Sequence, residues 1–164
     1  MSVIVRPATN FDARAMADLL NEIIRIGGTT ALTQDVTGDD IKEWMADNAE
    51  RAAWHVATDE DETCLGFQWI KPKASLPPEA CDIATFVKVG RTGLGTGSKL
   101  FDATKSAALA LGYDWINANI RSDNDSGLTY YQSRGFRTYD HDTGVTLAGG
   151  LTVDKTLKRY DLKD

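Results

Sequence analysis

The sequence predicts a single α/β domain, in which a mixed sheet carries helices on both of its faces. Its 164 residues match the usual length of one domain, and 42% of them are hydrophobic, which is enough to bury a core. Short apolar runs typical of strands are interspersed with segments whose apolar residues recur at helical spacing. Because the two kinds of segment do not alternate strictly, a sheet of mixed strand direction is favoured over a purely parallel one. Residues 1–164 are therefore expected to form one domain.

The N-terminal third predicts one strand and two helices. Residues 2–6 form a short strand, and Asn10 is expected to cap the first helix, which Gly27 closes. Residues 37–40 resemble a capping box and open the second helix. The apolar positions of the two helices are Phe11, Met16, Leu19, Leu20, Ile23, Ile24, Ile41, Trp44 and Met45.

The rest of the chain is expected to supply most of the sheet and two further helices. The acidic residues 59–62 indicate a turn between two hairpin strands, and three prolines make residues 71–78 a loop. The expected strands are 53–58, 65–70, 81–89, 115–120, 136–139 and 151–162. The expected helices are one that directly follows Gly97 and is stopped by Gly112, and one over residues 126–134.

Composition excludes several classes of protein. Eighteen Lys and Arg against 24 Asp and Glu give a net charge of −6, which argues against binding to nucleic acid or to an anionic membrane surface. Cys64, Cys81, His55 and His141 show no metal-site spacing, so no metal is expected. No apolar stretch approaches the ~20 residues that span a bilayer, and the N-terminus lacks a signal-peptide pattern. A cytoplasmic protein is expected.

Residues 90–97 are the most informative segment, because a strand runs through a glycine-rich turn into a helix there. Glycines allow close backbone approach, and free amides at a helix N-terminus attract anions, so a phosphate or pyrophosphate ligand is expected, with Arg91 and Lys99 as nearby cations. The P-loop motif fails because Ser98 stands where its last glycine belongs. The dinucleotide-binding fingerprint fails at the same residue. A tight turn that only requires positive φ angles is the structural alternative.

Two motifs resemble the GNAT superfamily of N-acetyltransferases, and the resemblance covers roughly residues 81–136. The family's Arg/Gln-x-x-Gly-x-Gly/Ala signature has one departure, because Thr92 occupies the Arg/Gln position and Arg91 stands one residue early. Downstream, an asparagine after a strand is followed by a helix that ends in Tyr-x-x-x-Gly-Phe. The matching residues are Val87, Gly95, Gly97, Leu100, Asn124, Tyr131, Gly135 and Phe136.

This resemblance implies a mostly antiparallel sheet of six to seven strands, with helices on both faces and splayed strands that hold acyl-CoA. It implies that the whole chain is a single N-acetyltransferase domain that uses acetyl-CoA. It places the cofactor's pantetheine arm beside one strand, its pyrophosphate on the glycine-rich turn, and the side chain of Asn124 on the CoA arm. The cofactor-binding residues that it implies are Thr85, Phe86, Val87, Thr92, Gly93, Leu94, Gly95, Thr96, Gly97 and Asn124.

Aminolysis of a thioester needs a base for the attacking amine and an acid for the departing thiolate. The resemblance points to Tyr131 as the general acid, and a phenol stays protonated at neutral pH. Asp82 and His55 are the two candidate bases. The expected mechanism is direct attack by the amine in a ternary complex, with backbone amides polarising the acetyl carbonyl.

The acceptor is expected to be a small primary amine that meets the first helices, residues 27–35 and the C-terminal hairpin. The N-terminal segment resembles the phosphinothricin-type acetyltransferases, which act on amino-acid-like molecules, while polyamine, aminoglycoside and peptide N-terminus acceptors stay open. The alternative is a non-catalytic acyl-CoA-binding sensor or interaction module with the same fold. Dimerisation through the C-terminal strands is common for the fold, but no apolar patch in the sequence requires a homodimer, and the oligomeric state stays open.

Overall fold

The computed structural model describes residues 2–90 and 95–163, and it confirms a mixed α/β domain. The strands are β1 (Ile4–Pro7), β2 (Ala53–Thr58), β3 (Cys64–Lys71), β4 (Ala80–Val87), β5 (Trp115–Arg121), β6 (Arg137–Thr146) and β7 (Thr152–Asp161). The helices are α1 (Ala13–Ile26), α2 (Gly38–Ala46), α3 (Thr96–Ala110) and α4 (Asp125–Ser133), with short 3₁₀ helices at Asn10–Asp12 and Ala49–Arg51.

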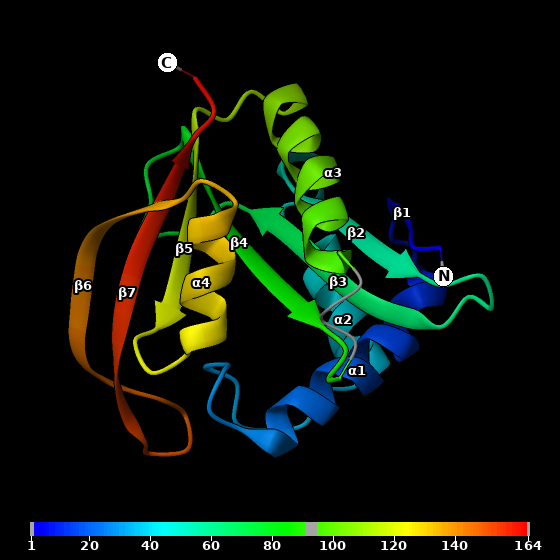
Figure 1. Ribbon diagram of the computed structural model, residues 1–164, viewed down its shortest axis with the longest axis horizontal. Coiled ribbons are helices and arrows are strands. Elements are labelled where there is room, and N and C mark those ends of the chain that lie inside the picture. Colours follow the sequence, from blue (N-terminus) through cyan, green and yellow to red (C-terminus); the bar gives the residue numbers. More distant parts are fainter. Residues whose placement is uncertain (1, 91–94, 164) are drawn as a thin grey trace.

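Seven strands form one sheet in the order β1-β2-β3-β4-β5-β7-β6 (Figure 1). Neighbouring strands run antiparallel except for β4 and β5, which are parallel. Their pairing is short, because it joins Ala80–Ile83 to residues 115–118 and then stops. Beyond that point the two strands diverge, as Figure 1 shows, and the predicted splay is therefore present.

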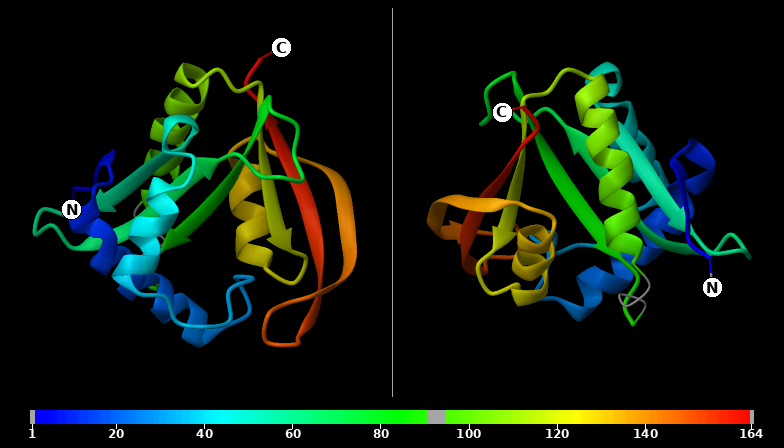
Figure 2. Two further views of the ribbon diagram at one scale, coloured as in Figure 1. Left: turned by 180° about the vertical axis from the view of Figure 1, so that it is seen from behind. Right: turned by 45° about the horizontal axis from the view of Figure 1, so that its top comes forward.

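Helices cover both faces of the sheet (Figures 1 and 2). On one face α1 and α2 pack over an aromatic cluster that includes Trp54, Phe67 and Trp69. On the other face α3 and α4 enclose a second core around Tyr113 and Ile116. Because strand side chains alternate between faces, Ile83 of β4 joins the second core, whereas Ala84 and Phe86 pack against the aromatic cluster.

The start of the first helix differs from the expectation. Thr9, not Asn10, begins the helical turn, and the Thr9 amide donates to the Asp12 carboxylate at 2.8 Å. Arg6 also holds Asp12 through two hydrogen bonds of 2.8 and 2.9 Å, so this carboxylate anchors the turn to β1. Phe11 is fully exposed rather than part of the core. Helical spacing alone could not show that the first residues form a 3₁₀ turn, which points this ring outward.

The C-terminal hairpin is longer than expected. The strand predicted for residues 136–139 begins at Arg137 and continues to Thr146, although its side chains are mostly exposed. Its sequence lacks the apolar alternation of a strand, and register shifts interrupt its pairing with β7 near Asp140 and Gly144. The neighbouring strand supplies the hydrogen bonds that stabilise β6, and this support is invisible in the local sequence.

Candidate active site

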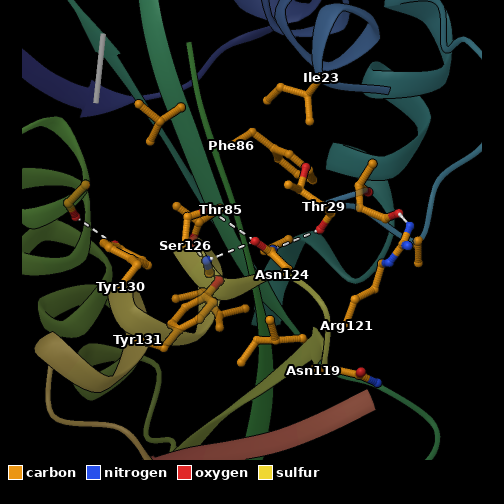
Figure 3. A pocket seen from close by; sticks show the side chains of 18 of the residues that line it. Ile23, Thr29, Thr85, Phe86, Asn119, Arg121, Asn124, Ser126, Tyr130 and Tyr131 are labelled. Atoms are coloured by element: carbon orange, nitrogen blue, oxygen red, sulfur yellow. Dashed lines mark hydrogen bonds between the residues drawn. The ribbon is translucent and has the colours of Figure 1, made fainter. Parts of the chain in front are cut away.

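A cavity of about 740 Å³ opens where β4 and β5 diverge. Its walls come from β4, β5, the N-terminus of α3, helix α4 and the loop after α1. Figure 3 labels lining residues from β4, β5, α4 and the segment around the end of α1. Residues 84–87 of β4 have no strand partner on the β5 side within the described ranges. Their main-chain groups on that edge are free to pair with an extended ligand.

Most of the predicted cofactor residues line this cavity. The structure brings together Asp82, Thr85, Phe86, Val87, Gly95, Gly97, Asn124 and Tyr131. Thr96 is buried at the start of α3 and does not line the cavity. Thr92, Gly93 and Leu94, together with Arg91, lie outside the described residues, so their predicted contacts stay predictions.

The N-terminus of α3 points its free amides toward the cavity. Gly95 is the residue before the helix and has a φ of 74°, a left-handed conformation that glycine adopts without strain. No side chain of residues 2–90 or 95–163 caps this end, so within those ranges the first-turn amides remain available to an anion. Lys99 was expected to add charge here, but its ammonium donates to the Val3 carbonyl at 3.2 Å, and Arg134 lines the cavity instead.

Gly97 is needed for packing as well as for any ligand. A Cβ at this position would lie 2.6 Å from a ring carbon of Tyr130. The Tyr130 hydroxyl donates to the Gly97 carbonyl at 2.8 Å, so α4 is joined to the start of α3. The glycine-rich motif therefore also reflects the close approach of an aromatic ring.

Tyr131 lies at the inner wall with 7% of its surface exposed. Its hydroxyl is 2.8 Å from the Thr85 hydroxyl, and Figure 3 shows the two side chains pointing toward each other. Burial raises the pKa of Tyr131 above its ordinary value, although the hydrogen bond with Thr85 opposes this effect. Tyr131 therefore carries its proton at neutral pH, as a general acid must.

Asp82 reaches the same cavity from the opposite face of β4. Asp82 and Ala84 share the face of the α1 and α2 core, whereas Ile83 and Thr85 point toward α3 and α4. Burial raises the pKa of Asp82, and the charge of Lys73 and a 2.9 Å hydrogen bond from Asn117 oppose this rise. A raised pKa makes this carboxylate a stronger base than an exposed aspartate.

His55, the other candidate base, is not among the residues that line the cavity. It lies on β2, two strands away from the splay, and pairs across strands with Pro7 and Gln68. Its Nδ1 is buried without a partner among the described residues, and burial lowers the pKa of the imidazole. The structure therefore brings Tyr131 and Asp82 to one site and leaves His55 outside it.

Asn124 caps α4, as its local sequence predicts. Its side-chain oxygen accepts from the Gly127 amide at 3.0 Å. Its amide nitrogen donates to the Thr29 carbonyl at 3.0 Å, a contact visible in Figure 3. Asn124 thus holds the loop after α1 against the splay, and its predicted contact with the CoA arm stays a prediction.

A group of cations at the β5–β7 end of the cavity was missed by sequence reasoning. Lys71, Lys73, Arg121 and Lys155 all line it. Arg121 is held by Asp123 through hydrogen bonds of 2.8 and 3.0 Å. Lys155 is 8% exposed, and its ammonium has no hydrogen-bond or ion-pair partner among residues 2–90 and 95–163. Lys155 and Arg121 are 34 positions apart and meet only through the register of β5 and β7.

Two features are absent from residues 2–90 and 95–163. In those ranges no group of three or more His, Cys, Asp and Glu side chains is arranged to hold a metal ion. None of the helices described combines the length and the apolar character needed to cross a bilayer.

Comparisons with known proteins agree with this geometry. No protein-family model matches the chain. Phosphinothricin N-acetyltransferase of Streptomyces coelicolor is 29% identical over 138 residues, which cover 81% of each chain. The YwnH protein of Bacillus subtilis is 26% identical over 161 residues, or 97% of this chain and 94% of the relative.

Solved structures establish the fold. A GNAT superfamily phosphinothricin acetyltransferase from Sinorhizobium meliloti, solved in complex with acetyl-CoA, has a TM-score of 0.88 at 17% identity and matches 99% of this chain and 90% of its own. An N-acetyltransferase from Staphylococcus aureus Mu50 has a TM-score of 0.86 at 21% identity, with 99% and 100% covered. The splayed sheet, the cavity in the splay and these sequence relatives together support a GNAT-type N-acetyltransferase.

Proposed function

We propose that this acetyltransferase transfers the acetyl group of acetyl-CoA to the primary amine of a small, amino-acid-like molecule by direct attack in a ternary complex. The observation that carries the proposal is the cavity in the splay, where a phenol and a carboxylate enter from opposite faces of the sheet. A thioester threaded between β4 and β5 would have an acid on one side and a base on the other. The named Streptomyces relative and the acetyl-CoA complex of the Sinorhizobium structure support this assignment.

The cavity fits acetyl-CoA at two places. The free edge of β4 at Thr85, Phe86 and Val87 offers main-chain groups to the amides of the pantetheine arm. The uncapped first turn of α3 after Gly95 offers amides to the pyrophosphate, and Arg134 adds a positive charge.

The proposed reaction balances its protons through two side chains. The neutral amine attacks the acetyl carbon, the C–N bond forms and the C–S bond breaks. Asp82, with its raised pKa, takes the proton that the amine loses, and Tyr131 gives its proton to the departing thiolate sulfur. The two groups act from opposite faces of β4, so neither competes with the other for one position.

The charge at the β5–β7 end supports an acceptor that carries an anionic group beside its amine. Lys71, Lys73, Arg121 and the unpartnered Lys155 face Asp82 there. The Asn119 side-chain oxygen also lines this end and is buried without a hydrogen-bond donor among the described residues. A carboxylate would pair with the cations, while the amine would donate to Asn119 and Asp82. A polyamine would meet repulsion in the same place.

The test is the release of free thiol from acetyl-CoA across a panel of amines. We expect acceleration by phosphinothricin or another α-amino acid, and at least tenfold less by the carboxamide of the same amine or by a polyamine. Acetyl-CoA binding is measured separately by calorimetry. If acetyl-CoA binds and no amine accelerates thiol release, the proposed reaction is wrong.

We also infer that the protein works in the cytoplasm. Its net charge of −6 supports the absence of binding to nucleic acid and to anionic membranes. A homodimer through the C-terminal strands is supported by β6, which ends the sheet and leaves its outer edge unpaired within the described ranges.

A further inference from the structure

A chain of hydrogen bonds behind the site links β3, β4, α4 and α3. Gln68 is fully buried, and its Nε2 donates to the Thr85 hydroxyl at 2.8 Å and to the Tyr130 hydroxyl at 3.0 Å. The Tyr130 hydroxyl donates to the Gly97 carbonyl at 2.8 Å, and the Thr85 hydroxyl is 2.8 Å from that of Tyr131. A fully buried amide is costly unless its polar atoms are paired, so its presence here calls for a reason.

The direction of each proton follows from the one group that can only accept. The Gly97 carbonyl has no proton, so Tyr130 must donate to it and must accept from Gln68. The amide nitrogen of Gln68 is therefore the atom that faces Tyr130. Rotating the amide by 180° would place its oxygen against the Tyr130 oxygen, whose proton is already used. The orientation persists although the Gln68 Oε1 is left buried without a partner in the described structure.

The same orientation fixes the bond between Thr85 and Tyr131. Thr85 accepts one N–H of Gln68, and the Tyr131 hydroxyl is the acceptor that lies within reach of its own proton. If Tyr131 donated instead, the proton of the half-buried Thr85 would have no protein acceptor among the described residues. With Thr85 as the donor, the Tyr131 proton is free of protein acceptors among the described residues, and it faces the cavity.

We propose that Gln68 is a positioning residue, which acts through Thr85 to direct the Tyr131 proton into the cavity that receives the thioester. The inference rests on the proposed acid role of Tyr131 and deepens it. Once Tyr131 gives up its proton, the Thr85 hydroxyl already points at the phenolate and stabilises it. No step of this chain requires Gln68 to touch a substrate.

Neutron diffraction of the cofactor-free protein tests the proton positions without any activity. We expect the Thr85 deuteron on the line to the Tyr131 oxygen, the Tyr130 deuteron on the line to Gly97, and the Tyr131 deuteron directed into the cavity. A Tyr131 deuteron on the line to Thr85 would overturn the proposal, whatever the enzyme acetylates.

A kinetic double-mutant cycle tests the consequence. Gln68→Met keeps a similar volume and removes both donations, and we expect it to lower kcat about tenfold while the acetyl-CoA Kd changes less than threefold. In a Tyr131→Phe background the same substitution should lower kcat less than twofold, because no acid remains to be positioned. Thr104→Val is the control, since Thr104 is also buried with an unpartnered hydroxyl in the described structure but lies outside this chain and outside the cavity.

The outcomes separate the two proposals. If Tyr131→Phe leaves kcat unchanged, the acid role itself is wrong. If Tyr131→Phe lowers kcat but Gln68→Met does not, or if Gln68→Met lowers kcat equally in both backgrounds, the positioning role is wrong. Melting temperatures of all variants exclude a loss of folding, and should Gln68→Met fail to fold, Thr85→Val replaces it with the same expected non-additivity.

Discussion

Replacing Lys155 by methionine should stabilise the protein and weaken acceptor binding at the same time. Lys155 as a residue is 8% exposed, and its ammonium has no partner in the described structure and lies in the field of Lys73 and Arg121. Burial, reinforced by those two charges, lowers its pKa, whereas Asp82 and Asp142 oppose the shift. The charge of Lys155 therefore lowers the stability of the folded protein. A carboxylate of the acceptor is the partner that would compensate this charge.

The magnitudes follow from the two effects separately. Replacing an uncompensated buried charge by an apolar side chain of similar length should raise the free energy of unfolding by about 1–2 kcal/mol. For a chain of this size, that raises Tm by about 2–8 °C. Loss of a charge-assisted hydrogen bond of about 1.5–3 kcal/mol raises the KM for an anionic acceptor about 10- to 100-fold. The KM for acetyl-CoA should not change.

The stability gain also depends on pH in a defined direction. The pKa of Lys155 is lowered in the folded protein, whereas in the unfolded chain it is about 10.4. At a pH between these two pKa values the unfolded state binds more protons at Lys155 than the folded state does. The free energy of unfolding of the wild type therefore rises with pH across that window. The advantage of the Met variant is therefore full at neutral pH and fades as the pH rises toward about 10.

Thermal denaturation and steady-state kinetics on the same preparations check both effects. Lys158→Met is the matched control, because Lys158 is equally buried on β7 but donates to the Thr138 hydroxyl at 2.8 Å and lies outside the cavity. It should lower Tm slightly and leave the acceptor KM unchanged. A Lys155→Met protein that melts lower than wild type with an unchanged acceptor KM would refute the reasoning, since Lys155 would then be a structural residue.

Three further predictions concern the catalytic pair and the glycine turn. Tyr131→Phe should lower kcat about 10²- to 10⁴-fold with little change in the acetyl-CoA Kd from calorimetry, because only proton donation is lost. Asp82→Asn should lower kcat and abolish the acid limb of the kcat/KM profile, which in the wild type should lie above the ordinary aspartate pKa because burial raises it; an unchanged limb would assign the base elsewhere. Gly97→Ala should lower the free energy of unfolding by about 1–3 kcal/mol in urea titrations, since the new Cβ would lie 2.6 Å from the Tyr130 ring. Tyr130→Leu should recover part of that loss, and no recovery would place the strain elsewhere.

Much of the fold and part of the site could be predicted from the sequence alone. Apolar spacing places α1 and α2, and a glycine turn between a strand and a helix indicates the uncapped start of α3 at Gly95. These features are local, because periodicity and turn chemistry depend on residues within one or two turns of each other. Motif resemblance added Tyr131 and Thr85, which the structure places 2.8 Å apart.

What the tertiary structure alone decided is which distant side chains share a face and which atoms remain unpaired. Asp82 and His55 were equal candidates in the sequence, yet only Asp82 belongs to the strand that splays from β5. Lys155 joins the site because the antiparallel register pairs it with Arg121, and a shift of one residue would turn it to the other face. Gln68 has the appearance of an ordinary strand residue in the sequence, and only the tertiary structure brings β4 and α4 to its amide. The sequence determined the helices, the strands and the glycine-rich turn, because these depend on neighbouring residues. The register of the strands and the packing of α4 against the sheet determined the charges and the proton directions of the site, because these depend on contacts between residues far apart in the chain.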